Sequence, residues 1–176
     1  MKKDTFRVAL CGVISAFAFM LMLLTNLIPV GTYALPCIAG ILLTAVVVEF
    51  GWKWALAAFA AVSLLSVFFA GDKEAVAYFI AFFGFYPIAK SGIERIRSLV
   101  VQYIIKYALF TVCMVAAFCF TVFVLMIPME EFKIFGFYVP WAFLIFAEIM
   151  FFFYDKCVTI LVTRYIISVR NKLFHF

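Results

Sequence analysis

Long apolar segments separated by short polar breaks run along the whole chain. Six segments are long and continuous enough to form membrane-spanning α-helices, which need about 20 apolar residues each. None shows the strict alternation that is typical of transmembrane β-strands. The predicted spans cover residues 8–28, 34–50, 54–70, 75–89, 104–127 and 139–162.

The fourth predicted span, 75–89, differs from the others. It is short and contains Gly84 and Pro87, which predict a kink or an early end. In the polar stretch that follows, 90–106, apolar residues recur at intervals of three and four. This spacing predicts a short amphipathic cytoplasmic helix that lies along the membrane surface between spans four and five.

Lysines and arginines are distributed unequally between the two ends of the predicted spans. If the N-terminus is inside, eleven of the 14 fall in cytoplasmic segments. Two, Lys73 and Lys133, fall on the opposite side, and Lys156 lies within the last span. The positive-inside rule therefore predicts that both termini are cytoplasmic. An odd number of spans would destroy this alternation, so the same count supports six.

The composition supports a membrane protein and changes little else. Hydrophobic residues make up 69% of the chain and charged residues 13%, with a mean hydropathy of +1.23, whereas soluble domains are about half apolar and a quarter charged. We therefore expect one all-α integral membrane domain over residues 1–176, with the lipid bilayer as its surroundings. The net charge of +5 is scattered over loop ends, which indicates topogenic charge and no nucleic-acid partner.

Catalytic signatures are missing from the sequence. His175 is the sole histidine and the penultimate residue, so no His-based triad or multi-His metal site can form within the membrane. The chain has no phosphate-binding glycine–lysine loop and no HExxH motif. Its five cysteines form no CxxC or Cys/His cluster. We expect no enzyme activity, no metal and no cofactor, so transport would need an ion gradient or an ATP-hydrolysing partner.

Glu148 is the most unusual polar residue of the predicted spans, because it lies near the middle of the sixth with no cation beside it in sequence. Intramembrane charges are costly and often functional. Glu148 is therefore a candidate ligand anchor or proton site, or else it is simply protonated or hydrogen-bonded within the bundle. Asp155 shares its face of the helix and belongs to the same site, or pairs with Lys156 near the inner interface.

Four further residues are candidates for a binding site in the outer half of the bundle. Asn26, near the outer end of the first span, could bind a ligand or a neighbouring helix. Tyr78 and Phe82 lie one turn apart on the fourth span, and Trp141 begins the sixth at the same level. These aromatics are either pocket walls or ordinary interfacial residues. With Glu148 they would suit a planar organic ligand.

Small residues recur at helical spacing on the cytoplasmic half of the first span: Ala9, Gly12 and Ala16. A small-xxx-small pattern lets another helix approach closely. That helix belongs either to the same bundle or to a separate protein that docks from the cytoplasmic side.

The chain resembles the substrate-binding S components of energy-coupling factor (ECF) vitamin transporters. The likeness lies in its size, in six predicted spans with both ends inside, and in the opening residues 7–16, RVALCGVISA. It extends to the short uncharged turn after the first span and the polar connection before the fifth. The resemblance covers the whole chain and names no particular vitamin.

The resemblance implies a function as well as a fold. In that family an Ala-xxx-Ala pattern on the first helix contacts the transmembrane coupling protein, and Gly12 and Ala16 occupy the matching positions here. Ligands bind in the outer half, which would implicate Tyr78, Trp141 and Glu148. The chain would bind a vitamin-like compound in a bacterial plasma membrane, as a multi-pass protein. Import would need the coupling protein and two cytoplasmic ABC ATPases, and the S component would topple within the membrane to deliver its ligand.

Two other functions fit the same sequence. The chain could be a non-transporting membrane scaffold, such as the small multi-span protein of the bacterial rod-shape complex, which is similar in size and also lacks catalytic motifs. It could instead be a proton-coupled carrier of small molecules that uses Glu148.

Overall fold

The described part of the chain is almost entirely helical. The computed structural model describes residues 2–28, 31–124, 133–134, 137–138 and 140–170. Its elements are α1 (Lys2–Leu24), α2 (Gly31–Phe50), α3 (Trp52–Phe69), α4 (Lys73–Tyr78), η1 (Phe79–Phe83), α5 (Tyr86–Ile93), α6 (Leu99–Phe123), β1 (Lys133–Ile134), β2 (Phe137–Tyr138), α7 (Pro140–Arg164) and η3 (Tyr165–Arg170). The two short strands pair in antiparallel fashion.

Five helical segments of the described residues are long and apolar enough to cross a membrane. They are Asp4–Leu24, Gly31–Phe50, Trp52–Phe69, Lys73–Ile93 and Leu99–Phe123. The chain is therefore an all-α, multi-pass membrane protein, as its hydropathy predicts. The observed segments match the first five predicted spans, with ends that differ by a few residues.

The reversal between α2 and α3 takes a single residue. Gly51 has a φ of 85°, a left-handed conformation that residues with a Cβ rarely adopt. Asp72 caps the N-terminus of α4. Its side chain accepts a hydrogen bond from the Ala75 amide at 2.9 Å, which satisfies an amide that has no partner within the helix.

The fourth membrane segment is broken, which confirms the kink predicted from Gly84 and Pro87. The α-helical pattern of α4 gives way to the π-helical turn η1, and α5 restarts at Tyr86. Pro87 lies in the first turn of α5, where its missing N–H leaves no hydrogen bond unmade. The break divides the fourth segment into two shorter helical pieces joined by η1.

The predicted amphipathic surface helix at 90–106 is wrong. Its first residues belong to α5, which continues to Ile93, and its later residues belong to α6, which begins at Leu99. The physical reason is that Lys90 and Lys106, at the two ends of the stretch, are each only 4% exposed. Burial of these side chains against the other helices holds both ends of the stretch within the bundle.

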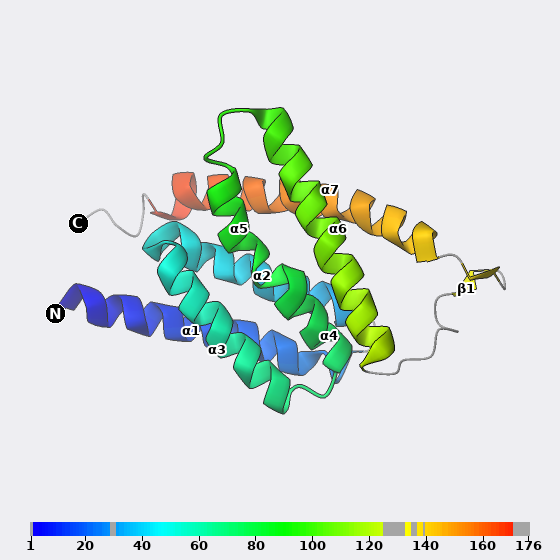
Figure 1. Cartoon of the computed structure of the whole chain (residues 1–176). Helices are drawn as coiled ribbons and strands as arrows, with labels where there is room; N and C mark the ends of the chain where they lie inside the picture. The colour runs from blue at the N-terminus through cyan, green and yellow to red at the C-terminus, as the bar shows by residue number, and fades with distance from the viewer. Residues whose placement is uncertain (1, 29–30, 125–132, 135–136, 139, 171–176) are drawn as a thin grey trace.

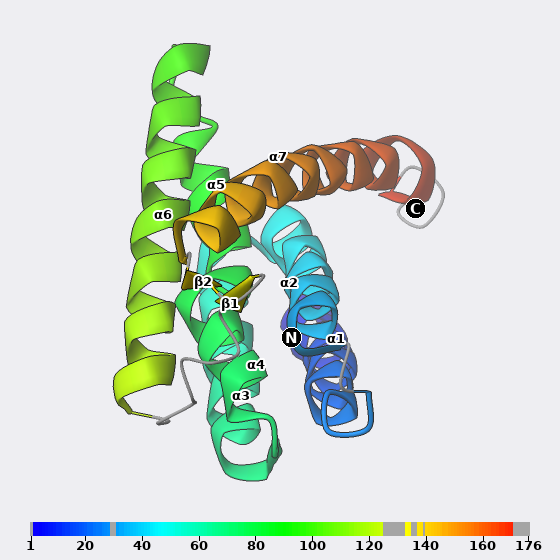
Figure 2. The same cartoon turned by 90° about the vertical axis from the view of Figure 1, so that its right-hand side faces the viewer.

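The helices run back and forth along the bundle. Figure 1 shows α1, α2 and α7 aligned roughly in one direction, with α6 crossing them obliquely, and Figure 2 shows α7 lying across the ends of α2 and α5. The start of α1 and the end of η3 lie at the same end of the bundle (Figure 1).

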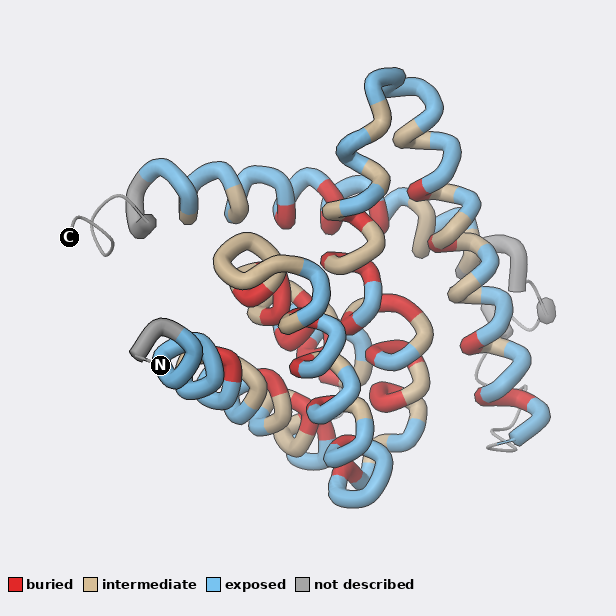
Figure 3. Tube along the Cα trace, turned by 60° about the vertical axis from the view of Figure 1, so that its left-hand side comes forward, coloured by how far each residue is buried: buried red, intermediate tan, exposed pale blue. Residues whose placement is uncertain are grey.

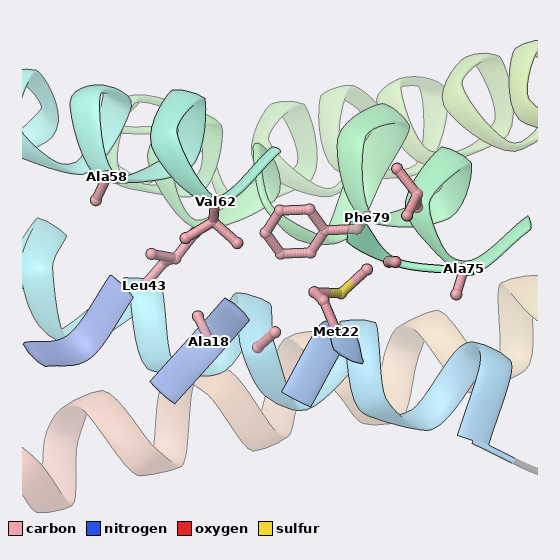
Figure 4. Close-up of a cluster of buried hydrophobic side chains, with 10 residues drawn as sticks. Ala18, Met22, Leu43, Ala58, Val62, Ala75 and Phe79 are labelled. Atoms are coloured by element: carbon pink, nitrogen blue, oxygen red, sulfur yellow. The ribbon is translucent and has the colours of Figure 1, made fainter. Parts of the chain in front are cut away.

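The first core lies between α1, α2, α3 and the α4–η1 segment. Figure 4 shows Ala18 and Met22 of α1 pointing toward Leu43 of α2, Val62 of α3 and Phe79 of η1. All five are fully buried. Small residues on α1 and α3, such as Ala18 and Ala58, let these helices pack closely around the buried ring of Phe79.

The exterior of the bundle is apolar. Phe68 and Phe123, for example, are 72% and 74% exposed, whereas Asp155 is only 5% exposed. Figure 3 shows exposed residues along the outer faces of the helices and buried ones toward the centre. Apolar side chains outside and charges inside are the arrangement that a lipid surrounding favours.

Candidate functional site

A group of buried polar side chains joins α5, α6 and α7, with Asp155 at its centre. Lys90 pairs with the Asp155 carboxylate. Lys106 Nζ lies 3.1 Å from each of the two carboxylate oxygens, and the Tyr86 hydroxyl donates to Oδ1 at 2.5 Å. Asp155 therefore receives hydrogen bonds from three donors on two other helices.

Glu94 and Thr159 complete this charge network, which we define as Tyr86, Lys90, Glu94, Lys106, Asp155 and Thr159. Glu94 Oε1 lies 2.7 Å from Lys90 Nζ and 2.8 Å from Lys106 Nζ. Lys90 also donates to Thr159 Oγ1 at 2.9 Å. Two lysines and two carboxylates thus balance in charge, which is the condition under which buried charges are tolerated.

Glu94 lies just beyond the end of α5 and is the most exposed carboxylate of the network. Partial burial would raise its pKa, but the hydrogen bonds from Lys106 and Lys90 outweigh burial and hold the pKa of Glu94 below its usual value. Glu94 therefore stays ionised at neutral pH, and the network keeps both negative charges.

The local sequence explains how the network assembles. Tyr86 and Lys90 lie four residues apart on α5, and Glu94 follows four residues later, just beyond the end of this helix. Asp155 and Thr159 lie four residues apart on α7. Residues four apart share one helix face, so two matching polar faces meet. The spacing of Tyr86, Lys90 and Glu94 was a signal that could have revealed this site from the sequence.

The alternative in which Asp155 pairs with Lys156 is wrong. Successive residues of a helix point in different directions, and Lys156 lies on the exposed side of α7. Its Nζ donates to the Tyr103 hydroxyl at 2.9 Å, while Asp155 faces inward.

An aromatic cluster lies directly against the charge network. Phe82, Tyr86, Phe110, Phe151 and Tyr154 are all buried. Phe110 stacks on Phe151 with ring centroids 4.5 Å apart, and Phe82 meets Phe110 edge to face at 4.9 Å. Phe82, a predicted ligand residue, is thus a central residue of this packed cluster.

Glu148 lies one turn from Phe151, at the contact between α6 and α7. Its Oε1 atom lies 2.5 Å from Thr111 Oγ1. Its Oε2 atom is buried and has no hydrogen-bond partner among the described residues. None of the ion pairs formed by the described residues includes Glu148. Glu148 is the one predicted site residue whose described surroundings leave a polar atom unsatisfied inside the bundle.

Asn26 and Tyr78 lie at the opposite end of the bundle from the charge network. The Asn26 side-chain oxygen accepts hydrogen bonds at 2.8 Å from the amides of Gly71 and Asp72. Tyr78 is buried and packs against Tyr33, with ring centroids 5.0 Å apart. Asn26 thus joins two loops, as in the helix-bonding alternative, and a ligand role for either residue stays a prediction.

Trp141 lies in the first turn of α7, and its side chain falls outside the described part of the structure. The four predicted ligand residues whose side chains the structure describes lie in two separate groups. Phe82 and Glu148 line the region between α6 and α7, and Asn26 and Tyr78 lie around the 71–78 segment.

The small residues of α1 face outward. Ala9, Gly12 and Ala16 are exposed, and a Cβ added at Gly12 would meet no atom within 4 Å. A shallow groove beside them is lined by Val13, Ala16, Phe17 and Met20. Packing within the bundle, the alternative use of these residues, does not occur in the structure.

Comparison with protein-family models, with curated proteins and with solved structures finds no match.

Proposed function

We propose that the chain is the membrane-embedded substrate-binding subunit of an ECF-type importer for a vitamin-like micronutrient. In this proposal α7 is the sixth span and both termini are cytoplasmic. The observation that carries the proposal is the division of the bundle into two sides. An exposed small-residue face on α1 is suited to docking, and polar and aromatic groups gather between α4 and α7.

The dimensions of α7 support a sixth span. Its 25 residues extend about 37 Å at 1.5 Å per residue, more than the roughly 30 Å of hydrocarbon. The charge network then lies toward the cytoplasmic end and Asn26 toward the outer end, in keeping with the distribution of lysine and arginine.

The charge network supports a binding subunit that cannot transport alone. It ties α5, α6 and α7 together at the proposed cytoplasmic end, so a ligand would enter and leave from the outer end. Delivery would then require the whole subunit to topple, driven by the coupling protein and two ABC ATPases. The apolar exterior of α1–α3, with exposed Phe17, Met20 and Phe68, is compatible with rotation through lipid.

Affinity purification with mass spectrometry tests this proposal. The tagged chain should recover a transmembrane coupling protein and paired ABC-type ATPases. Substituting Gly12→Leu and Ala16→Leu together should abolish that recovery, because the added side chains occupy the surface where the partner helix packs. The matched control is Val112→Leu, which enlarges an exposed side chain on α6. Recovery of cell-wall synthesis proteins in place of the ATPases would favour a scaffold.

A proton-coupled carrier is the second candidate, and the unsatisfied carboxyl oxygen of Glu148 favours it. A carrier would take up its substrate as the purified chain in liposomes when a proton gradient is applied. Glu148→Gln would abolish that uptake. The ECF proposal predicts no uptake under these conditions.

A further inference from the structure

The hydroxyl group of Thr111 has two neighbours that accept hydrogen bonds. Its Oγ1 lies 2.9 Å from the carbonyl oxygen of Tyr107 and 2.5 Å from Glu148 Oε1. A threonine hydroxyl has one hydrogen to donate and two lone pairs that accept. A carbonyl oxygen can only accept, and so can an ionised carboxylate.

If Glu148 is ionised, only the hydroxyl hydrogen of Thr111 is available for the two contacts that Thr111 Oγ1 makes, one with the Tyr107 carbonyl oxygen and one with Glu148 Oε1. One of the two pairs would then be two acceptors facing each other without a proton between them. A proton on Glu148 removes the conflict, because the carboxyl then donates to Thr111 Oγ1 and the hydroxyl donates to the Tyr107 carbonyl. Both contacts become ordinary hydrogen bonds in a continuous chain.

The charges around Glu148 agree with this assignment. The titratable group that faces it from α6 is Tyr107, which carries no positive charge. Lys106, the residue before Tyr107, is directed to Asp155 and Glu94, and so is Lys90. Among the described residues no cation is left to balance an ionised Glu148, and an unbalanced charge within a membrane is strongly disfavoured.

We propose that Glu148 is a proton-binding site, held as a neutral carboxylic acid by the chain Glu148–Thr111–Tyr107 carbonyl. The Oε1 atom carries the proton. The buried Oε2 atom is then an uncharged acceptor with a free lone pair. This contrasts with Asp155 seven residues later, which three donors keep ionised.

The chemistry of Glu148 defines a ligand class, and this part of the inference rests on the proposed function. A neutral carboxyl oxygen accepts a hydrogen bond from an uncharged N–H or O–H group. It offers no counter-charge to a cationic ligand. A ligand that reaches Glu148 would therefore be a neutral molecule with a hydrogen-bond donor.

Infrared difference spectroscopy of the purified, ligand-free chain tests the proton site directly. The difference between wild type and Glu148→Gln at neutral pH should contain the C=O stretch of a protonated carboxylic acid. The matched control is Glu94→Gln, which should remove only carboxylate bands, since Glu94 is ionised between two lysines. Loss of carboxylate bands alone from Glu148→Gln would overturn the proposal.

Thr111→Val provides a second variant that keeps the carboxyl in place. Removing the hydroxyl that accepts its proton should shift the C=O band of Glu148 to higher frequency without abolishing it. An unchanged acid band would overturn the hydrogen-bond chain. Because neither measurement involves a ligand or a partner protein, both can fail while the transport proposal stands, and the reverse also holds.

A ligand-binding measurement tests the ligand class. With a defined panel of vitamins as probes, the member that binds wild type should bind Glu148→Gln within about threefold, because an amide donates and accepts in the same positions as a neutral acid. Loss of binding by more than tenfold in Glu148→Gln, or selection of a cationic member of the panel, would overturn the assignment.

Discussion

The carboxylate of Asp155 compensates the positive charges of the two buried lysines, Lys90 and Lys106. Removing one partner of a buried ion pair leaves an uncompensated charge and costs about 3–5 kcal/mol. Asp155→Asn keeps the shape of the side chain but leaves Lys90 and Lys106 to share Glu94. We expect this substitution to lower the free energy of unfolding by that amount, measured by denaturant or thermal unfolding in detergent.

The control for Asp155→Asn is Asp4→Asn. Asp4 forms an exposed pair with Arg7, at 3.4 Å, and exposed pairs contribute less than about 1 kcal/mol. If Asp155→Asn unfolded at the same temperature as Asp4→Asn, the charge network would have no structural role.

The contact between α2 and η1 depends on the absence of a side chain at Gly40. A Cβ at this position would lie 2.9 Å from the backbone carbonyl carbon of Phe83 and 3.3 Å from the Tyr154 hydroxyl. Because backbone atoms cannot swing away, Gly40→Ala should force α2 and η1 apart and destabilise the protein by about 1–3 kcal/mol. Unfolding measurements in detergent would detect this loss.

Gly12→Ala is the matched control, since nothing lies within 4 Å of the added Cβ. Alanine is favoured over glycine within a helix by about 1 kcal/mol, so this variant should be as stable as wild type or slightly more stable. Equal destabilisation by the two substitutions would contradict the close approach of α2 and η1.

At the scale of elements, hydropathy predicted where the helices lie but did not predict which of their polar side chains are buried. Apolar runs located the first five spans, and Gly84 and Pro87 located the break in the fourth. The stretch 90–106 was misread because hydrophobic periodicity describes one helix at a time. Lys90 and Lys106 look solvated in sequence. Both also pair with the carboxylate of Asp155, 49 residues beyond Lys106, and local periodicity does not reveal this distant partner.

The candidate site was predictable only in part from the sequence. Glu148 stands out in sequence because a charge in an apolar run is rare, and its Oε2 atom has no hydrogen-bond partner among the residues that the structure describes. Its partner Thr111 was not predictable, since threonines are common in spans and nothing local marks this one. Tyr78 and Phe82 lie one turn apart in sequence, yet the break at η1 places them in different surroundings.

The orientation of the whole molecule can be measured with single cysteines. In a background with the five native cysteines replaced by alanine, Leu27→Cys at the proposed outer end should react with a membrane-impermeant maleimide on intact cells. Arg97→Cys, in the turn between α5 and α6, should react only after permeabilisation. Both residues are exposed, so access to the reagent decides the outcome. The reverse pattern would contradict cytoplasmic termini.

The most direct test of the proposed function is to compare binding and uptake with the same purified chain. The chain should bind one member of a defined vitamin panel in detergent. Reconstituted alone in liposomes, it should take up none of that compound, with or without a proton gradient, until the coupling protein and ATPases recovered with it are added with ATP. Uptake by the chain alone across a proton gradient would contradict the account and show a carrier.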